Sequence, residues 1–242
     1  MRIVAIGGGE IGRPGTKVET TKIDKEIIKL TGKKHLKLLF LSTASNDSES
    51  YFEVVKKHFE KRLKCKVDVL YLTKNSGNVE NKILSSDIIY VGGGNTLKMM
   101  KIWRKLKIDK ILRKAGEKDI VLSGVSAGSM CWFKAGLSDS RKMNNPKAPY
   151  IKVNCLGFIP FLHCPHYAEK GRKPGLKKLM KKTSGKALAL DNCAAMEIID
   201  NKFRIISSKK NACGYFVYYS KGKFFHEKIG KDKWFDLIGK DM

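Results

Sequence analysis

A Gly-x-Ser-x-Gly motif supplies the strongest candidate nucleophile in this chain. Ser126 stands between Gly124 and Gly128, directly after the apolar run 120–123 and before a helical pattern. A serine at the tip of a tight strand-to-helix turn needs neighbours almost without side chains, because the backbone there is crowded. The motif therefore predicts a nucleophile elbow, with a helix N-terminus beside it that favours the oxyanion formed during acyl transfer.

A second glycine cluster, residues 92–94, follows the strand-like run 87–91 and precedes another helical pattern. In sheets of parallel strands covered by helices, ligands bind beyond the carboxyl ends of the strands. Both glycine clusters fall at such ends. We therefore expect the second cluster to lie near Ser126 and to supply a second oxyanion donor.

A serine hydroxyl is a poor nucleophile until a base accepts its proton, so a histidine is required. The sequence holds five. His166 follows Pro165, which fixes the local backbone, and we expect His166 to be the base. His163, in the same extended loop, is expected to be packed or hydrogen-bonded in a structural role. The remaining three are expected at the surface: His35, His58 and His226.

The base needs an acceptor that orients its ring and stabilises its charged form. Asp191 and Asn192 follow the apolar run 187–190, and Asp139 lies in a separate polar segment. A place at a strand end favours the Asp191–Asn192 pair. Either residue can instead cap a turn through its own backbone, so the sequence leaves the choice among the three open.

Apolar runs typical of buried strands alternate with helical stripes through the first half of the chain. The second half carries β-like runs joined by short turns, which indicate antiparallel pairing. We predict a doubly wound, mostly parallel α/β sheet flanked by helices, with a late antiparallel extension, in a single domain over residues 1–242. The expected strands are 2–6, 36–42, 67–72, 88–91, 120–123, 187–190, 195–199, 203–206 and 215–219, and the segment 138–150 is expected to be a loop.

The chain is strongly basic, with 49 Lys and Arg against 23 Asp and Glu and a formal net charge of +26. Such a charge raises the question of nucleic-acid binding. The lysines, however, are spread over nearly every expected helix instead of forming one arginine-rich stripe. We expect no specific nucleic-acid partner, weak salt-sensitive adhesion to polyanions, and some long-range attraction of acidic substrates.

Other features of the sequence limit the compartment and the cofactors. The six cysteines show no Cys-x-x-Cys pair or zinc-like spacing, so we expect reduced thiols, and Cys131 is expected in the core. No apolar run is long enough to span a bilayer, and residues 1–6 lead into a strand instead of a signal peptide. Residues 7–9 resemble a dinucleotide-binding turn only superficially. We expect a cytoplasmic monomer or homodimer without metal, organic cofactor or membrane contact.

Three motifs in order carry a resemblance to a known family: Gly92-Gly93-Gly94-Asn95-Thr96, Gly124-Val125-Ser126-Ala127-Gly128 and Cys164-Pro165-His166-Tyr167. The chain resembles the dipeptidase E family of serine peptidases, whose relatives include cyanophycinases, over essentially its whole length. The resemblance implies a doubly wound α/β fold related to class I glutamine amidotransferases. It also implies hydrolysis of aspartyl peptide bonds near an N-terminus.

The same resemblance implies roles for particular residues. Ser126 matches the family nucleophile and His166 the base, while the backbone amides of Gly94 and Ala127 match the oxyanion hole. Asn95, in the glycine-rich motif, is assigned to substrate binding.

The resemblance also implies a basic residue past the histidine that selects an aspartyl side chain. Arg172 matches it, because a guanidinium can bind a carboxylate through two hydrogen bonds. Arg172 can equally be one more cation of the basic run 170–173. The family commonly places Glu where this chain has Asn192, and asparagine can orient a histidine but cannot neutralise an imidazolium.

The expected function is that of a serine exopeptidase acting on short peptides, with N-terminal aspartate as the expected first residue and an acyl-enzyme on Ser126. Two alternatives remain. A cyanophycinase-like or esterase-like hydrolase would share the same residues with a different pocket. The other alternative is a binding protein that has this fold but no catalytic activity, and Asn192 is the main observation in its favour.

Overall fold

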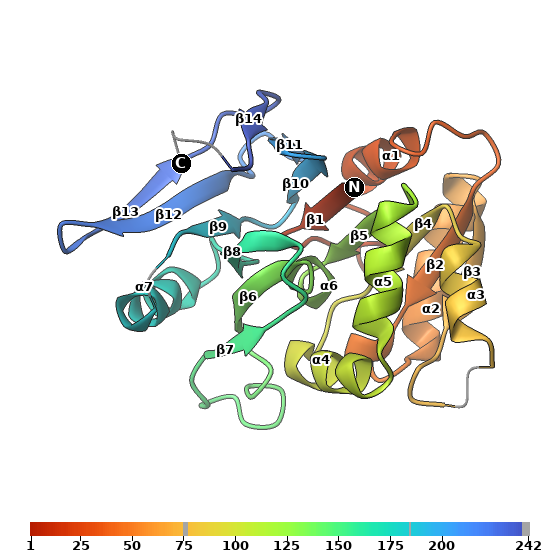
Figure 1. Ribbon diagram of the computed structural model, residues 1–242, viewed down its shortest axis with the longest axis horizontal. Helices are drawn as coiled ribbons and strands as arrows, with labels where there is room; N and C mark the ends of the chain where they lie inside the picture. The colour runs from red at the N-terminus through yellow and green to blue at the C-terminus, as the bar shows by residue number, and fades with distance from the viewer. Residues whose placement is uncertain (75–76, 184, 239–242) are drawn as a thin grey trace.

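The computed structural model describes residues 1–74, 77–183 and 185–238. An eight-stranded sheet forms one half of the molecule, in the order β14-β11-β10-β1-β5-β4-β2-β3 (Figure 1). Its five parallel strands are the apolar runs that the sequence predicts, with ends that differ by one or two residues. They are β1 (Arg2–Ile6), β2 (Lys37–Leu41), β3 (Lys66–Leu70), β4 (Ile88–Val91) and β5 (Val121–Val125).

Helices cover both faces of this sheet, as its alternating apolar side chains require. On one face Ile23, Ile27 and Val55 pack against the sheet, and on the other Met99 and Leu112 do. The helices that contribute these side chains, and their neighbours, are α1 (Thr21–Lys29), α2 (Glu49–Lys56), α3 (Val79–Leu84), α4 (Thr96–Lys105) and α5 (Ile108–Glu117). The predicted α/β fold is confirmed for this half.

The second half differs from the single extended sheet that the sequence predicts. A separate six-stranded sheet runs in the order β13-β12-β9-β8-β6-β7, and α7 (Arg172–Lys182) packs on it through Leu176 and Met180. Its strands are β6 (Phe133–Ser138), β7 (Ile151–Asn154), β8 (Ile159–Cys164), β9 (Ala187–Leu190), β12 (Gly214–Ser220) and β13 (Lys223–Lys228). The other late strands, β10 (Ala194–Ile199), β11 (Lys202–Ser207) and β14 (Phe235–Asp236), join the first sheet.

The expected antiparallel extension is therefore only partly correct. Strands β10 and β11 pair antiparallel, but β8 pairs parallel with both β6 and β9. Pro160 and His163 lie within β8, and these polar or strand-disfavouring residues gave that segment the pattern of a loop. The parallel β8–β9 pairing matters for the site, because it brings the carboxyl ends of both strands to one edge.

The expectation that His58 lies at the surface is wrong. Helix α2 continues into a π-helical turn, η2 (Lys57–Arg62), and His58 in this turn is 1% exposed. Its Nε2 lies 2.8 Å from Oδ2 of the buried Asp24, which also accepts a hydrogen bond from Thr20. The buried carboxylate supplies a partner that the sequence pattern of the helix alone did not reveal.

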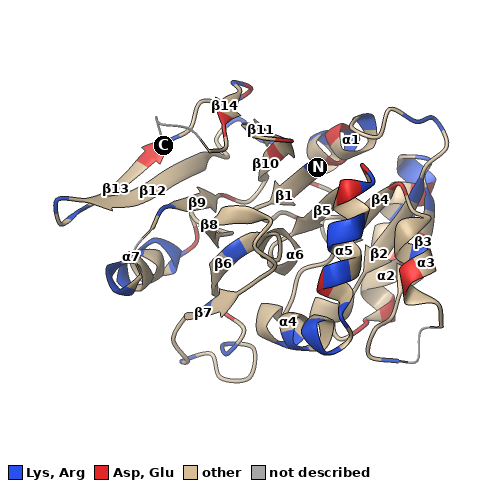
Figure 2. Cartoon of the chain, viewed as in Figure 1, with Lys and Arg blue, Asp and Glu red and all other residues tan. Residues whose placement is uncertain are grey.

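Lysine and arginine residues are distributed over α4, α5, α7 and several loops, where the ribbon is blue in Figure 2. This distribution agrees with the scattered lysines of the sequence and shows no single basic stripe in this view. In the described ranges, none of the helices has the length and apolarity that crossing a bilayer requires.

Candidate active site

The nucleophile elbow forms as the motif predicts. Ser126 has φ 57° and ψ −110°, a conformation that non-glycine residues rarely adopt and that persists only where the surroundings enforce it. A Cβ at Gly124 would lie 2.6 Å from the carbonyl oxygen of Gly128, and a Cβ at Gly128 would lie 2.0 Å from that of Val91. Both flanking positions therefore require glycine.

The glycine turn after β1 positions both the candidate nucleophile and the candidate base. The Ser126 amide donates to the carbonyl of Ile6 at 3.0 Å, and the His166 amide donates to that of Gly7 at 3.0 Å. A Cβ at Gly8 would lie 2.1 Å from Oδ1 of Asn192 and 2.5 Å from the His166 ring. The turn is structural, as the sequence indicates, and its missing side chains leave room for the base.

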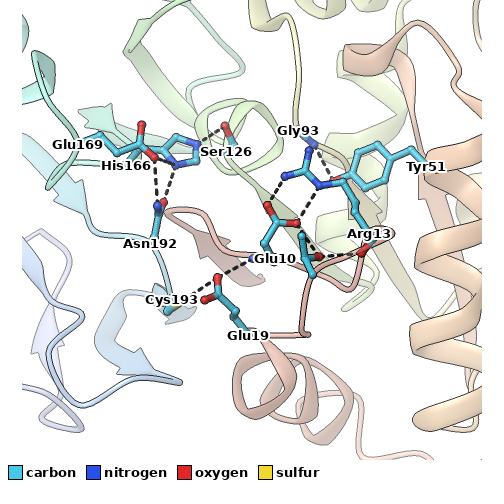
Figure 3. Close-up of polar contacts among 11 residues, drawn as sticks. Glu10, Arg13, Glu19, Tyr51, Gly93, Ser126, His166, Glu169, Asn192 and Cys193 are labelled. Carbon is cyan, nitrogen blue, oxygen red and sulfur yellow. Dashed lines mark hydrogen bonds and ion pairs between the residues drawn. The ribbon is translucent and has the colours of Figure 1, made fainter.

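Ser126, His166 and Asn192 form a hydrogen-bonded chain (Figure 3). His166 Nε2 lies 2.7 Å from Oγ of Ser126, and His166 Nδ1 lies 2.5 Å from Oδ1 of Asn192. The amide oxygen of asparagine only accepts, so Nδ1 carries the proton in the neutral ring and Nε2 accepts the serine proton. This is the tautomer that a general base for Ser126 requires.

The surroundings keep His166 neutral. Burial lowers the pKa of its imidazole below the ordinary value, while Glu169 and Asn192 raise it and so oppose part of that effect. The side chain remains 19% exposed. A neutral ring at physiological pH has a free lone pair on Nε2 for the Ser126 proton.

Of the three acceptors that the sequence leaves open, the structure brings only Asn192 to the histidine. The Asp191 carboxylate accepts from the Cys213 amide and the Tyr215 hydroxyl, at 3.1 and 3.3 Å. Asp139 pairs with Arg172 at 2.6 Å. The expectation that Asp191 orients the histidine is therefore not met, because its carboxylate instead accepts hydrogen bonds at the start of β12.

The amides expected to form an oxyanion hole are available. Within the described ranges no acceptor is bound to the amide of Gly94 or of Ala127, whereas the Gly93 amide donates to the Tyr51 hydroxyl at 3.3 Å. Gly94 has φ 138°, and a Cβ there would lie 2.3 Å from the carbonyl oxygen of Ala44. The helix after the elbow, α6 (Ala127–Met130), is a single turn, so its macrodipole is small and the Ala127 amide itself is the relevant donor.

Ser126 and His166 border a cavity of about 730 Å³, which is large enough for a short peptide. Arg13 is the one lysine or arginine among its described lining residues, and its guanidinium contacts both carboxylate oxygens of Glu10. Figure 3 draws the Glu10–Arg13 pair on the side of Ser126 away from His166. The other polar lining residues include Glu19, Ser45, Ser48, Ser50, Tyr51, Glu169 and Asn192.

The two residues expected to bind substrate lie elsewhere. The Arg172 side chain is 4% exposed, pairs with Asp139 and covers the ring of Tyr150. Asn95 caps α4: its Oδ1 accepts from the Lys98 amide at 2.9 Å, and its amide nitrogen donates to the Ser140 carbonyl. Neither is among the described residues that line the cavity. Both side chains are occupied by protein partners, a use that the motif does not distinguish from substrate binding.

His163 is structural, as expected. It is fully buried in β8, its Nδ1 lies 2.8 Å from the carbonyl oxygen of Leu188, and its Nε2 lies 3.0 Å from Oγ of Ser129. Burial lowers its pKa to about 3, so the ring is neutral. Cys131 is also fully buried, which confirms the prediction of a core residue.

Four charged residues that line the cavity were not anticipated from the sequence: Glu10, Arg13, Glu19 and Glu169. Glu169 follows His166 by three residues and lies 3.3 Å from its Nδ1, and Arg13 lies in the loop after β1. The spacing of Glu169 is the only signal that was present. Within the described part of the chain, no cluster of three His, Cys, Asp or Glu residues is arranged to hold a metal ion.

The family model of peptidase family S51 matches residues 3–206. The chain belongs to this family. It is 34% identical over 220 residues to the uncharacterized peptidase YgaJ of Bacillus subtilis (strain 168), covering 89% of this chain and 91% of that one. It is 26% identical over 152 residues to the uncharacterized peptidase Lmo0363 of Listeria monocytogenes (strain EGD-e), covering 61% of this chain and 74% of that one.

Solved structures share the fold of this S51 chain. A peptidase from an acI-B1 Actinobacterium superposes with a TM-score of 0.71 at 16% identity, over 97% of this chain and 96% of that one. A provisionally named peptidase E from Listeria monocytogenes EGD-e gives 0.62 at 18% identity, over 85% and 98%. The family match confirms the resemblance drawn from the motifs, and the chain is a serine-type peptidase.

Proposed function

We propose that this S51 peptidase is a serine exopeptidase that cleaves dipeptides and other short peptides with an N-terminal aspartate, through an acyl-enzyme on Ser126. The observation that carries the proposal is the 2.7 Å contact between Ser126 Oγ and His166 Nε2 at the wall of the 730 Å³ cavity. A nucleophile and a base in hydrogen-bond contact beside a peptide-sized cavity suit acyl transfer.

In the proposed reaction Ser126 Oγ attacks the scissile carbonyl carbon while its proton passes to His166 Nε2. The C–N bond then breaks as Nε2 returns that proton to the leaving amine. Water attacks the resulting ester and gives a proton to Nε2. The C–Oγ bond then breaks as Nε2 passes that proton to Ser126 Oγ, which regenerates the serine and releases the free acid. The Gly94 and Ala127 amides would stabilise the oxyanion in both steps.

The charges around the cavity support the choice of an aspartyl N-terminus. An N-terminal aspartate carries an ammonium group and a carboxylate close to the scissile carbonyl. Glu10 and Glu19 line the cavity and would share their carboxylates between their present partners, Arg13 and Lys209, and the ammonium, while Arg13 offers a guanidinium for the side chain. A bound aspartyl residue would share Arg13 with Glu10, and the two hydrogen bonds of a guanidinium suit a carboxylate. Arg13 thereby takes the place that the sequence gives to Arg172.

The cysteines support a cytoplasmic location for this activity. All six are free thiols, and five of them are buried: Cys65, Cys131, Cys164, Cys193 and Cys213. A protein with this many unpaired cysteines fits a reducing compartment.

The proposal is tested with four substrates: Asp-Leu, Asn-Leu, Leu-Leu and N-acetyl-Asp-Leu. We expect kcat/KM for Asp-Leu to exceed that for Leu-Leu by about 100-fold, because a site built for polar groups rejects analogues that lack them. Arg13→Gln should remove most of this preference through KM. The matched control is Arg141→Gln, at an exposed arginine outside the cavity lining.

Equal rates on all four peptides, or an unchanged preference in Arg13→Gln, would contradict the proposed specificity. Rapid hydrolysis of the acetylated peptide would show that the free ammonium is not recognised and would argue against an exopeptidase.

A further inference from the structure

We propose that Glu169 supplies the negative charge that Asn192 lacks, so that Ser126, His166, Asn192 and Glu169 act together as a four-membered relay. This inference rests on the proposed roles of Ser126 and His166. It assigns Glu169 as a positioning residue, because it acts on the reacting atoms through His166.

The direction of the hydrogen bonds carries the argument. Asn192 Nδ2 donates to Glu169 Oε1 at 3.1 Å, and an ionised carboxylate only accepts. That contact turns the amide oxygen of Asn192 toward His166, whose Nδ1 donates to it. Every donor in the chain, from the Ser126 hydroxyl onward, points toward the next residue, and the last acceptor is the carboxylate of Glu169 (Figure 3).

Glu169 is also close enough to act on the ring directly. Its Oε1 lies 3.3 Å from His166 Nδ1, so one carboxylate oxygen contacts both the ring and the amide. When Ser126 attacks, the ring gains a proton and a positive charge, which an amide alone does not neutralise. A carboxylate at this distance stabilises that charge in the transition state more than in the neutral ground state.

In the described part of the chain, no cationic side chain other than His166 neutralises the charge of Glu169. Of the lysines and arginines that the structure describes, none forms an ion pair with Glu169, whereas Glu10 pairs with Arg13 and Glu19 with Lys209. The side chain is 50% exposed in the free protein. A peptide in the cavity would displace water from it, and the interaction with the imidazolium would then strengthen.

Local backbone geometry fixes the carboxylate beside the base. His166 has φ 54°, and the Glu169 amide donates to the His166 carbonyl at 2.9 Å, which closes a turn. The base and its acid therefore belong to one loop, and Asn192 enters from the end of the neighbouring strand. This arrangement explains how a chain with asparagine at the third position retains an anionic partner.

The test compares Glu169→Gln with wild type in the rate of labelling of Ser126 by a fluorophosphonate. The substitution keeps an acceptor for Asn192 and removes the charge. We expect a fall of about 10-fold, as for a partly screened ion pair that forms in the transition state. Glu80→Gln is the matched control, since Glu80, on α3, is 48% exposed and paired with Lys114 of α5.

The pH profile separates electrostatics from structural support. Besides Glu169, the charged groups that act on His166 are Asp139, which raises its pKa, and Arg172, which lowers it. The labelling rate rises with pH as His166 loses its proton. Glu169 raises that pKa, so Glu169→Gln should move the acid limb of the profile to lower pH while the plateau falls. A purely structural role predicts a lower plateau with no such shift.

A second substitution tests whether the lost charge can be restored. Asn192→Asp in the Glu169→Gln background places a carboxylate directly on Nδ1 and should restore at least half of the lost rate. Wild-type rates and an unmoved acid limb in Glu169→Gln would overturn this inference and leave Ser126 and His166 in their roles. No labelling of the folded wild type would overturn the relay and the proposed function together.

Discussion

The two sides of the active site are built in different ways. The nucleophile side is one short segment of β5 and α6, in which the backbone conformation of Ser126 is enforced by close contacts at Gly124 and Gly128. The base side joins two segments, the loop after β8 with His166 and Glu169, and the residue after β9, Asn192. Local sterics fix the first side, and long-range placement together with hydrogen bonds fixes the second.

From this difference we expect the base side to accept other residues more readily than the nucleophile side. The serine elbow requires glycine at both flanking positions, because a Cβ there would collide with backbone atoms that cannot move aside. The base side needs only an acceptor for Nδ1 and a charge within reach, and several residue pairs satisfy that need. Here asparagine provides the acceptor, and by our inference Glu169 provides the charge.

The largest expected effect comes from breaking the nucleophile side with Gly128→Ala. A Cβ would lie 2.0 Å from the Val91 carbonyl oxygen, an atom of a central strand. We expect a loss of about 3 kcal/mol or more in the free energy of unfolding, measured by urea denaturation, and loss of labelling at Ser126. Gly230→Ala, where the nearest heavy atom is 3.5 Å away, is the control. A stable, fully reactive Gly128→Ala protein would refute the steric account.

Gly8→Ala disturbs the base side and should spare the fold. Its Cβ would collide with the ends of the Asn192 and His166 side chains, which can move aside. We expect near wild-type stability with a fall of about 100-fold in kcat/KM, because a displacement near 1 Å in a catalytic group has that effect. If catalysis instead stayed within a factor of two, the turn would not be what positions the base.

The smallest expected effect on catalysis is that of Arg172→Met. Arg172 is buried against Tyr150 and paired with Asp139, whose side chain is 37% exposed. We expect a loss of about 1–2 kcal/mol in the free energy of unfolding, less than for a fully buried pair because water screens Asp139. The ratio of kcat/KM for Asp-Leu to that for Leu-Leu should stay unchanged. A fall in kcat/KM for Asp-Leu but not for Leu-Leu would indicate that Arg172 contacts the substrate.

The sequence was most informative where function depends on local geometry. The Gly-x-Ser-x-Gly motif identified Ser126 because its glycines are required by contacts within the same turn and the neighbouring strand. Pro165 and the family resemblance pointed to His166, and the place after the apolar run 187–190 pointed to the pair Asp191–Asn192. The structure then selects Asn192, whose Oδ1 lies 2.5 Å from His166 Nδ1.

Pairing across the chain was beyond the reach of sequence patterns. Arg172 and Asp139 are 33 residues apart and form an ion pair, which no sequence pattern indicates, so the sequence could not decide between a substrate-binding and a structural role for Arg172. The second sheet was missed because β8 contains proline and histidine and lacks a clear apolar alternation. Arg13 had no signal in the sequence, because only the folded structure shows that its loop lines the same cavity as Ser126.

The most direct test of the central claim is reaction of the purified protein with a fluorophosphonate probe, followed by mass spectrometry of the labelled peptide. The comparison includes wild type, Ser126→Ala and His166→Ala, each checked for folding by circular dichroism. We expect one label on Ser126 in the wild type, none in Ser126→Ala and at least a 100-fold slower reaction in His166→Ala. No labelling of the folded wild type, or labelling that does not need His166, would contradict an activated serine at this site.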